Sequence, residues 1–226
     1  MRNDIGFCSI RVLVLMGALL LGSGCATSRG AIALDIPVES SPVAVQNKSI
    51  AIRSVKDQRV FENDPRDPAI PSLGFGGIDQ VSLEERKRAI ARKRNSYGKA
   101  LGDVFLENGN TVELLVSDML KSVLRELGYT IVDRNQVRSD TLVMDVTIEK
   151  FWAWFTPGFW AITLRSDIAT TINVGQASSG MRQQKKITIH EENSGQAATT
   201  GAWKAIFLKA LASYKENAKS QLSELK

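Results

Sequence analysis

Residues 141–174 read TLVMDVTIEKFWAWFTPGFWAITLRSDIATTINV, two runs of alternating character around Thr156-Pro157-Gly158. In each run apolar residues occupy every second position, which places them on one face of an extended strand. The three residues between the runs have the composition of a turn. We therefore expect an antiparallel hairpin with strands at 141–155 and 159–174, buried on one face and exposed to solvent on the other.

The tip of this hairpin concentrates six aromatic residues within ten positions: Phe151, Trp152, Trp154, Phe155, Phe159 and Trp160. Alternation sends Trp152 and Trp154 to one face and the two neighbouring phenylalanines to the other, so a single core cannot easily cover them all. Two interpretations are open. Either a helix or a long loop covers one face, or the tip is exposed and binds a partner or a membrane interface.

Two segments carry apolar residues at spacings of three and four, which is typical of amphipathic helices. The first covers residues 111–127, with Asn110 at its start and Gly128 as the residue that ends it. The second covers residues 202–225, with lysines outside its apolar stripe. Both stripes are typical of core-facing helices.

Shorter alternating runs predict strands at 32–36, 50–55, 129–132 and 184–190. Between the second of these and the first helix, residues 61–79 lose all periodicity and hold three of the six prolines and three glycines. A glycine-rich phosphate site needs a strand before it and a helix after it, together with a lysine and a hydroxyl, and these are not in place. We expect a long loop here.

Ser82 and Glu85 have the spacing of a capping box, which predicts that a helix begins here and covers residues 82–95. Six cations follow within nine positions: Arg86, Lys87, Arg88, Arg92, Lys93 and Arg94. They form either a solvated helix or partly disordered arm, or a contact with the phosphates of lipid headgroups or lipopolysaccharide. Only the second alternative predicts salt-sensitive binding.

The order of these elements predicts an α+β fold in a single domain over residues 31–226. We expect two layers, a mostly antiparallel sheet with the two amphipathic helices packed on one face.

The N-terminus has the pattern of a bacterial export signal. Arg2 and Arg11 bracket a polar start, residues 12–21 are apolar, and small residues lead into Cys25. The apolar run is shorter than the roughly 20 residues of a transmembrane helix. The pattern predicts a signal peptide over residues 1–24.

This segment resembles the signal of bacterial lipoproteins, in which lipid is attached to the cysteine and the chain is cut just before it. The resemblance implies lipidation of Cys25, a tether over residues 25–30 and, with no aspartate beside the cysteine, the periplasmic side of the outer membrane. The signal usually has leucine where this chain has Gly22. An ordinary secretory signal cut near Ala26, leaving a soluble periplasmic protein, is the alternative.

Composition limits the chemistry. Cys8 lies in the removed segment and Cys25 would carry lipid, so no disulfide is expected. The net charge of +5 is modest and, in the periplasm, does not indicate nucleic acid. Plain solubility explains it best, and anionic lipids or glycans are the available anionic partners. His190 is the only histidine. A zinc site needs three or four ligands, and the spacing of the sequence nominates no Ser or Asp as a catalytic partner of His190. We expect no catalytic residues, no metal, no cofactor and no enzymatic activity.

The mature chain resembles the YajG-like family of uncharacterised bacterial lipoproteins. Four segments carry the resemblance: the signal ending at Cys25, the strand 32–36, SIAIRSVKDQR at 49–59, and the helix-to-strand unit ending Leu127-Gly128-Tyr129. The family implies an envelope lipoprotein and supplies no catalytic residues. We therefore expect a non-enzymatic adaptor or structural component of an envelope assembly. It would dock onto another envelope protein through the aromatic tip, with the basic helix as a second candidate surface. A lipoprotein that binds lipid or glycan is the alternative, and the oligomeric state is open.

Overall fold

The computed structural model describes residues 30–36, 48–95, 97–107, 109–180 and 182–225. Cys25, the signal peptide and most of the predicted tether lie outside these residues. The strands of the described chain are β1 (Gly30–Ile32), β2 (Ser49–Asp57), β3 (Ala89–Arg94), β4 (Ala100–Leu106), β5 (Thr130–Ile131), β6 (Leu142–Pro157), β7 (Ile162–Gln176) and β8 (Gln183–Gly195). Its α-helices are α2 (Leu83–Arg88), α3 (Val112–Glu126) and α4 (Thr200–Ser223).

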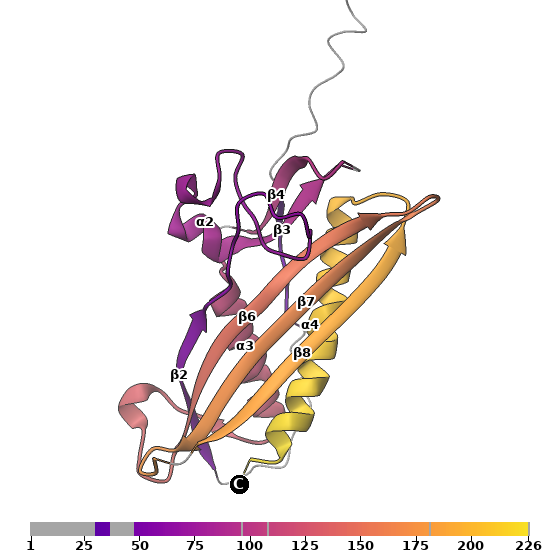
Figure 1. Ribbon diagram of the computed structural model, residues 1–226. Helices are drawn as coiled ribbons and strands as arrows, with labels where there is room; N and C mark the ends of the chain where they lie inside the picture. Colours follow the sequence, from indigo (N-terminus) through magenta and orange to yellow (C-terminus); the bar gives the residue numbers. More distant parts are fainter. Residues whose placement is uncertain (1–29, 37–47, 96, 108, 181, 226) are drawn as a thin grey trace, which may run out of the picture.

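The long strand β6 organises the sheet, which has eight strands in the described part of the chain (Figure 1). On one edge β6 pairs antiparallel with β7 along its whole length, and β7 pairs in turn with β8. On the other edge β2 runs parallel to the first half of β6, from Ile50 opposite Leu142 to Asp57 opposite Ile148. Further along that edge β3 takes the place of β2, with Ala91 opposite Ala153.

The α+β class and the hairpin are confirmed, but a mostly antiparallel sheet was wrong. The β1–β4, β2–β5, β2–β6 and β3–β6 pairs are parallel, whereas β3–β4, β6–β7 and β7–β8 are antiparallel. Alternation in a sequence tells which face of a strand is buried, and it says nothing about the direction of the neighbouring strand. The sheet is therefore mixed.

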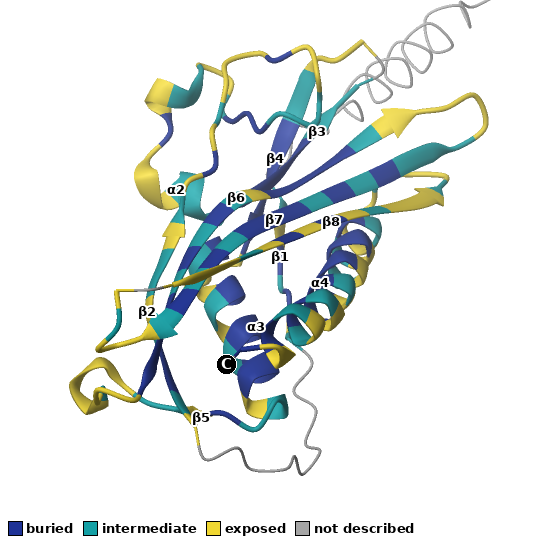
Figure 2. Cartoon of the chain, turned by 60° about the horizontal axis from the view of Figure 1, so that its bottom comes forward, coloured by how far each residue is buried: buried dark blue, intermediate teal, exposed yellow. Residues whose placement is uncertain are grey.

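Helices α3 and α4 pack side by side on one face of the sheet, with their buried stripes toward it (Figure 2). Thr111, one residue later than predicted, caps α3 by accepting a hydrogen bond from the backbone N–H of Leu114. Gly128 follows with a φ of 85°, the left-handed conformation that ends helices. Both predicted helices are confirmed to within about two residues at each end.

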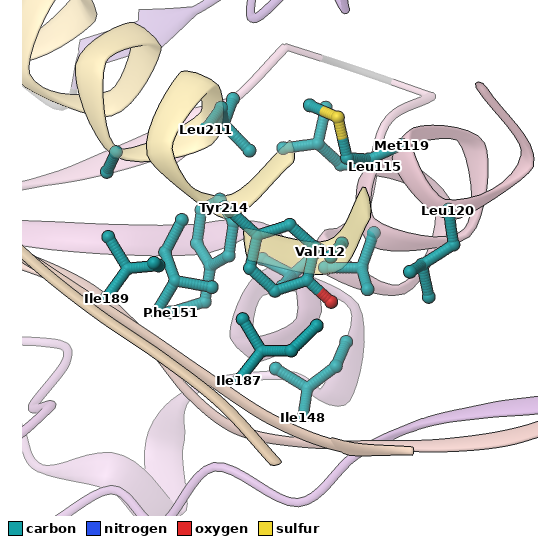
Figure 3. Packing of buried hydrophobic residues seen from close by; sticks show 14 of the residues in the cluster. Val112, Leu115, Met119, Leu120, Ile148, Phe151, Ile187, Ile189, Leu211 and Tyr214 are labelled. Carbon is teal, nitrogen blue, oxygen red and sulfur yellow. The ribbon is translucent and has the colours of Figure 1, made fainter. Parts of the chain in front are cut away.

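The main core fills the space between these helices and the strands (Figure 3). Phe151 of β6 stacks on Phe207 of α4, with ring centroids 5.4 Å apart. The hydroxyls of Thr170 and Tyr214 share a buried hydrogen bond of 2.9 Å. Figure 3 shows side chains of both helices meeting those of the sheet: Val112, Leu115, Met119, Leu120, Ile148, Phe151, Ile187, Ile189, Leu211 and Tyr214.

A second, smaller core lies on the opposite face of the sheet. The chain between β2 and α2 folds over this face and supplies Leu73 and Val81, which pack with Trp152, Trp154 and other side chains of the strands. The indole N–H of Trp152 donates to the carbonyl of Pro68 at 3.2 Å. At this end of the sheet the fold therefore has a third layer, beyond the two that the sequence predicted.

The predicted basic helix over 82–95 is wrong in its second half. The capping box of Ser82 and Glu85 is present, so the start is confirmed, but α2 ends at Arg88 and β3 begins with the next residue. Tertiary pairing overrides local helical preference here, because β3 joins β4 on one side and β6 on the other.

Arg59 fills the place where β2 leaves β6 and β3 takes over, and its side chain is completely buried. One guanidinium nitrogen donates to the carbonyls of Ala89 at 2.6 Å and Phe151 at 3.0 Å. The other pairs with Asp57 at 2.7 Å and donates to the carbonyl of Arg86 at 2.9 Å. A single side chain thus satisfies carbonyl oxygens of three segments where the ladder of the sheet is interrupted.

Asp145 joins β2 to β6 at the other half of this edge. It accepts hydrogen bonds from Arg53 at 2.9 Å and from the hydroxyl of Ser54 at 2.8 Å, and Arg182 lies 2.6 Å away. The hydrogen bond from Arg53 is the main reason that the pKa of Asp145 falls from 3.8 to about 2, against the opposing effect of burial.

Asp145→Asn is expected to cost roughly 1 to 2 kcal/mol of unfolding free energy at pH 7, because the carboxylate is stabilised only in the folded chain. Since the folded pKa is depressed, this contribution is complete above about pH 4 and is lost as the pH falls toward about 2. Urea unfolding of both chains between pH 7 and pH 2 measures the difference. Asp118→Asn, at an exposed pair with Lys121, is the control; an equal and equally pH-dependent loss there would contradict the assignment.

Candidate functional site

The β3–β4 and β6–β7 turns lie at one end of the sheet, and the first described residue, Gly30, lies toward that end, four residues along β4 from its start. Because β6 runs parallel to β3, the turn after β6 and the turn after β3 point the same way (Figure 1). β1 is parallel to β4 with Gly30 opposite Val104, so the chain enters the fold from this direction. The side chain of Lys93 reaches across β4 from β3 to Gly30, where a Cβ would be 3.4 Å from the Lys93 ammonium nitrogen. We call this end the tip end: Gly30, residues 95 and 97–99, and residues 158–161.

The three most exposed large apolar side chains of the described chain are all at the tip end. Tyr97 is 93% exposed, Phe159 89% and Trp160 83%. The rings of Phe159 and Trp160 meet edge to face, with centroids 4.7 Å apart. Folding usually removes such surface from water, so these three residues form the candidate contact surface of the described chain.

Both tips are ordered by hydrogen bonds of their own. In the β6–β7 turn the N–H of Gly158 donates to the carbonyl of Ala161 at 2.9 Å. In the β3–β4 turn the Asn95 side chain accepts from the N–H groups of Tyr97 at 3.0 Å and Lys99 at 2.9 Å. The exposed aromatic residues therefore stand on hydrogen-bonded turns.

The structure divides the six aromatic residues predicted as a binding tip. Phe151 faces the helices, Trp152 and Trp154 lie beneath the long loop, and Phe155 is half-buried. Of the six, only Phe159 and Trp160 are exposed. The long loop therefore covers one face of the strand, as the first interpretation expects, but it does not cover Phe159 and Trp160 at the turn; binding by this pair stays a hypothesis.

The predicted cations are also divided, and those of α2 have partners in three neighbouring segments. Arg86 and Arg88 donate to backbone carbonyls of neighbouring segments. Lys87 forms an ion pair with Glu113 at 3.0 Å, which ties α2 to α3. These three side chains have structural partners and do not form an exposed basic face.

The cations of β3 lie nearer the tip end. Arg92 is buried, 3.7 Å from Asp103 on the adjacent strand, and donates to the carbonyl of Gly74 at 2.6 Å. Arg94 donates to the hydroxyl of Ser72 at 2.8 Å, and burial, with the charge of Arg92 beside it, lowers the pKa of Arg94. Lys93 is half-buried beside Gly30.

His190, for which the sequence predicted no catalytic or metal-binding role, lies on β8. His190 is half-exposed, with its Nδ1 2.7 Å from an oxygen of Asp167 on the adjacent strand. The described ranges contain no group of three or more His, Cys, Asp or Glu that could hold a metal ion. None of the helices described is long and apolar enough to cross a membrane.

A hollow of about 420 Å³ lies at the end of the sheet opposite the tip end. Leu142, Val174 and Leu225 supply apolar walls, and Arg182 supplies a charge. Its volume is within the range of small-molecule sites. The sequence did not predict this hollow, because its walls come from four separate segments.

No family model and no curated protein sequence matches the chain, so membership of the YajG-like family stays a hypothesis. Among solved structures, an uncharacterised protein is similar in fold, with 12% identity and a TM-score of 0.42 over 87% of this chain and 99% of the other. Another is described as a "putative neuraminyllactose-binding hemagglutinin homolog" from Helicobacter pylori. It has 10% identity and a TM-score of 0.38, over 85% of this chain and 95% of the other. Both are distant similarities of chain arrangement.

Proposed function

We propose that this chain is a lipid-anchored lipoprotein on the periplasmic side of the outer membrane, and that it acts by binding, as an adaptor or structural component of an envelope assembly. The observation that carries the proposal is the exposure of Tyr97, Phe159 and Trp160 at the end where the chain enters the fold. The signal pattern before Cys25 supports the anchor independently.

The short connection between anchor and fold gives the molecule a fixed polarity. Cys25 precedes Gly30 by five residues, which span at most about 17 Å when fully extended. A lipid on Cys25 would therefore hold the tip end close to the membrane. β6 has 16 residues and so extends roughly 50 Å. The opposite end would stand away from the membrane, as suits a protein that connects a membrane to another envelope component.

Intact mass of the protein extracted from membranes tests the anchor. We expect a mature chain that begins at Cys25 and carries the added mass of a diacylglycerol and an acyl group, found in the outer-membrane fraction. Cys25→Ser is expected to lose the lipid mass and the cleavage before residue 25, since the thiol is the acceptor. An unlipidated chain that begins after Cys25 would contradict the proposal and favour a soluble periplasmic protein.

A further inference from the structure

The tip end carries the aromatic side chains that suit a membrane surface. Tyr and Trp are enriched where lipid headgroups meet hydrocarbon, because their rings are apolar and their O–H and N–H groups are polar. Here Tyr97 and Trp160 are highly exposed side chains on two separate turns, with Phe159 beside the tryptophan. None of these three side chains packs into either core, so core packing does not explain why apolar rings occupy both turns.

The charges of the tip end suit the same surface. Residues 95–99 read NSYGK and residues 158–161 read GFWA, so neither turn contains an acidic residue. Lys99 is exposed, and Lys93 and Arg94 lie at the end of β3 that leads into the first turn. Cations next to exposed aromatic rings complement the phosphates of lipid headgroups.

The exposed side chains of the tip end could contact a lipid bilayer or a protein, and the position of the anchor favours the bilayer. From this we infer that Tyr97, Phe159 and Trp160 lie in the headgroup region of the same membrane that holds the lipid of Cys25. The inference rests on the proposed anchor and names the surface that the tip end contacts. The lipid on Cys25 would hold the fold beside the bilayer, so the exposed rings of the same molecule would meet that bilayer at a high effective concentration.

Quenching by brominated lipids tests this contact. The lipidated full-length mature protein is reconstituted into vesicles of phosphatidylethanolamine and phosphatidylglycerol, with or without bromine on the acyl chains. The difference in fluorescence between wild type and Trp160→Phe isolates the signal of Trp160, since Trp152, Trp154 and Trp203 are buried. We expect the brominated lipids to quench that signal, because a tryptophan at the interface lies next to the acyl chains.

A tryptophan at the opposite end is the matched control. Gln184→Trp in the Trp160→Phe background places an indole at an exposed position near the start of β8, and we expect no quenching of it. Quenching at both positions would mean that the protein lies flat, and would overturn the inference. No quenching of Trp160 would overturn it as well.

Failure of the contact and failure of the anchor give different results. If intact mass shows lipid on Cys25 but Trp160 is not quenched, the anchor holds and the membrane contact is wrong. If Trp160 is shielded only in native outer-membrane vesicles and not in pure lipid, its partner is a protein, which also overturns the inference. If no lipid is attached, both proposals fall together.

Discussion

Arg59→Met is expected to lower the free energy of unfolding by about 3 to 5 kcal/mol, the usual cost of removing one partner of a buried ion pair. The side chain is fully buried, forms an ion pair with Asp57, and donates hydrogen bonds to the carbonyls of Ala89, Phe151 and Arg86. Methionine has a similar length and cannot donate, so it would leave a buried carboxylate and these carbonyls unsatisfied. Urea unfolding of the mature chain at neutral pH, followed by circular dichroism, measures the loss.

Two further variants separate the charge of Arg59 from its geometry. Arg59→Lys keeps the positive charge but loses the planar fork, so we expect a loss between those of wild type and methionine. Arg66→Met removes an exposed arginine of the same loop and should change stability by no more than about 0.5 kcal/mol. A loss below about 1 kcal/mol for Arg59→Met would show that the sheet does not depend on this residue.

Trp152→Ala is expected to cost about 3 to 5 kcal/mol, whereas Trp160→Ala should cost no more than about 0.5 kcal/mol. Trp152 is 1% exposed, meets Phe61 edge to face with centroids 6.0 Å apart, and donates to the carbonyl of Pro68. Trp160 is 83% exposed. The two substitutions remove the same side chain from the same hairpin, so burial accounts for the difference.

Urea unfolding of both variants, again followed by circular dichroism, checks this pair of predictions. Trp152→Ala should also release the loop that covers it, which limited proteolysis would detect as faster cleavage near the three prolines of residues 61–79. Equal losses for the two variants would contradict the division of the aromatic residues into a buried group and an exposed pair.

The elements with strong local periodicity were predictable from the sequence. The apolar stripe of α3, the alternation of β6 and β7, and the stop at Gly128 all depend on residues close together in the chain. Alternation also placed Phe151 and Trp152 on opposite faces, as the structure has them. These features follow from the 3.6-residue and two-residue periods of helix and strand.

Strands β3 and β4 were not predictable in the same way. The sequence AIARKR of β3 has three consecutive cations, which on their own indicate a solvated segment. In the fold Arg92 is buried because Asp103 lies opposite it on β4, and because the long loop covers both. The partner that permits burial is too far along the chain for a local pattern to reveal.

The sequence indicated which aromatic residues belong to the candidate site, but it did not indicate which of them are exposed. Six aromatic residues were expected at the tip, but burial of Trp152 depends on a loop without periodicity. Tyr97 was missed because an isolated tyrosine in a polar segment carries no pattern. The signal that could have found it was the short NSYGK sequence, which has the composition of a turn.

The position of β6 in the chain has a consequence for how the protein reaches this fold. Both β2 and β3 pair with β6, which is synthesised long after them; Arg53 and Asp145 of the first pair are 92 residues apart. The N-terminal half therefore leaves the ribosome with β2 lacking its partner β6, and with β3 paired on its β4 side alone. Folding can begin in the local β6–β7–β8 meander, and the earlier strands add to it afterwards, at the cost of closing long loops. Until then the nascent chain is at its most prone to aggregate and depends most on chaperones.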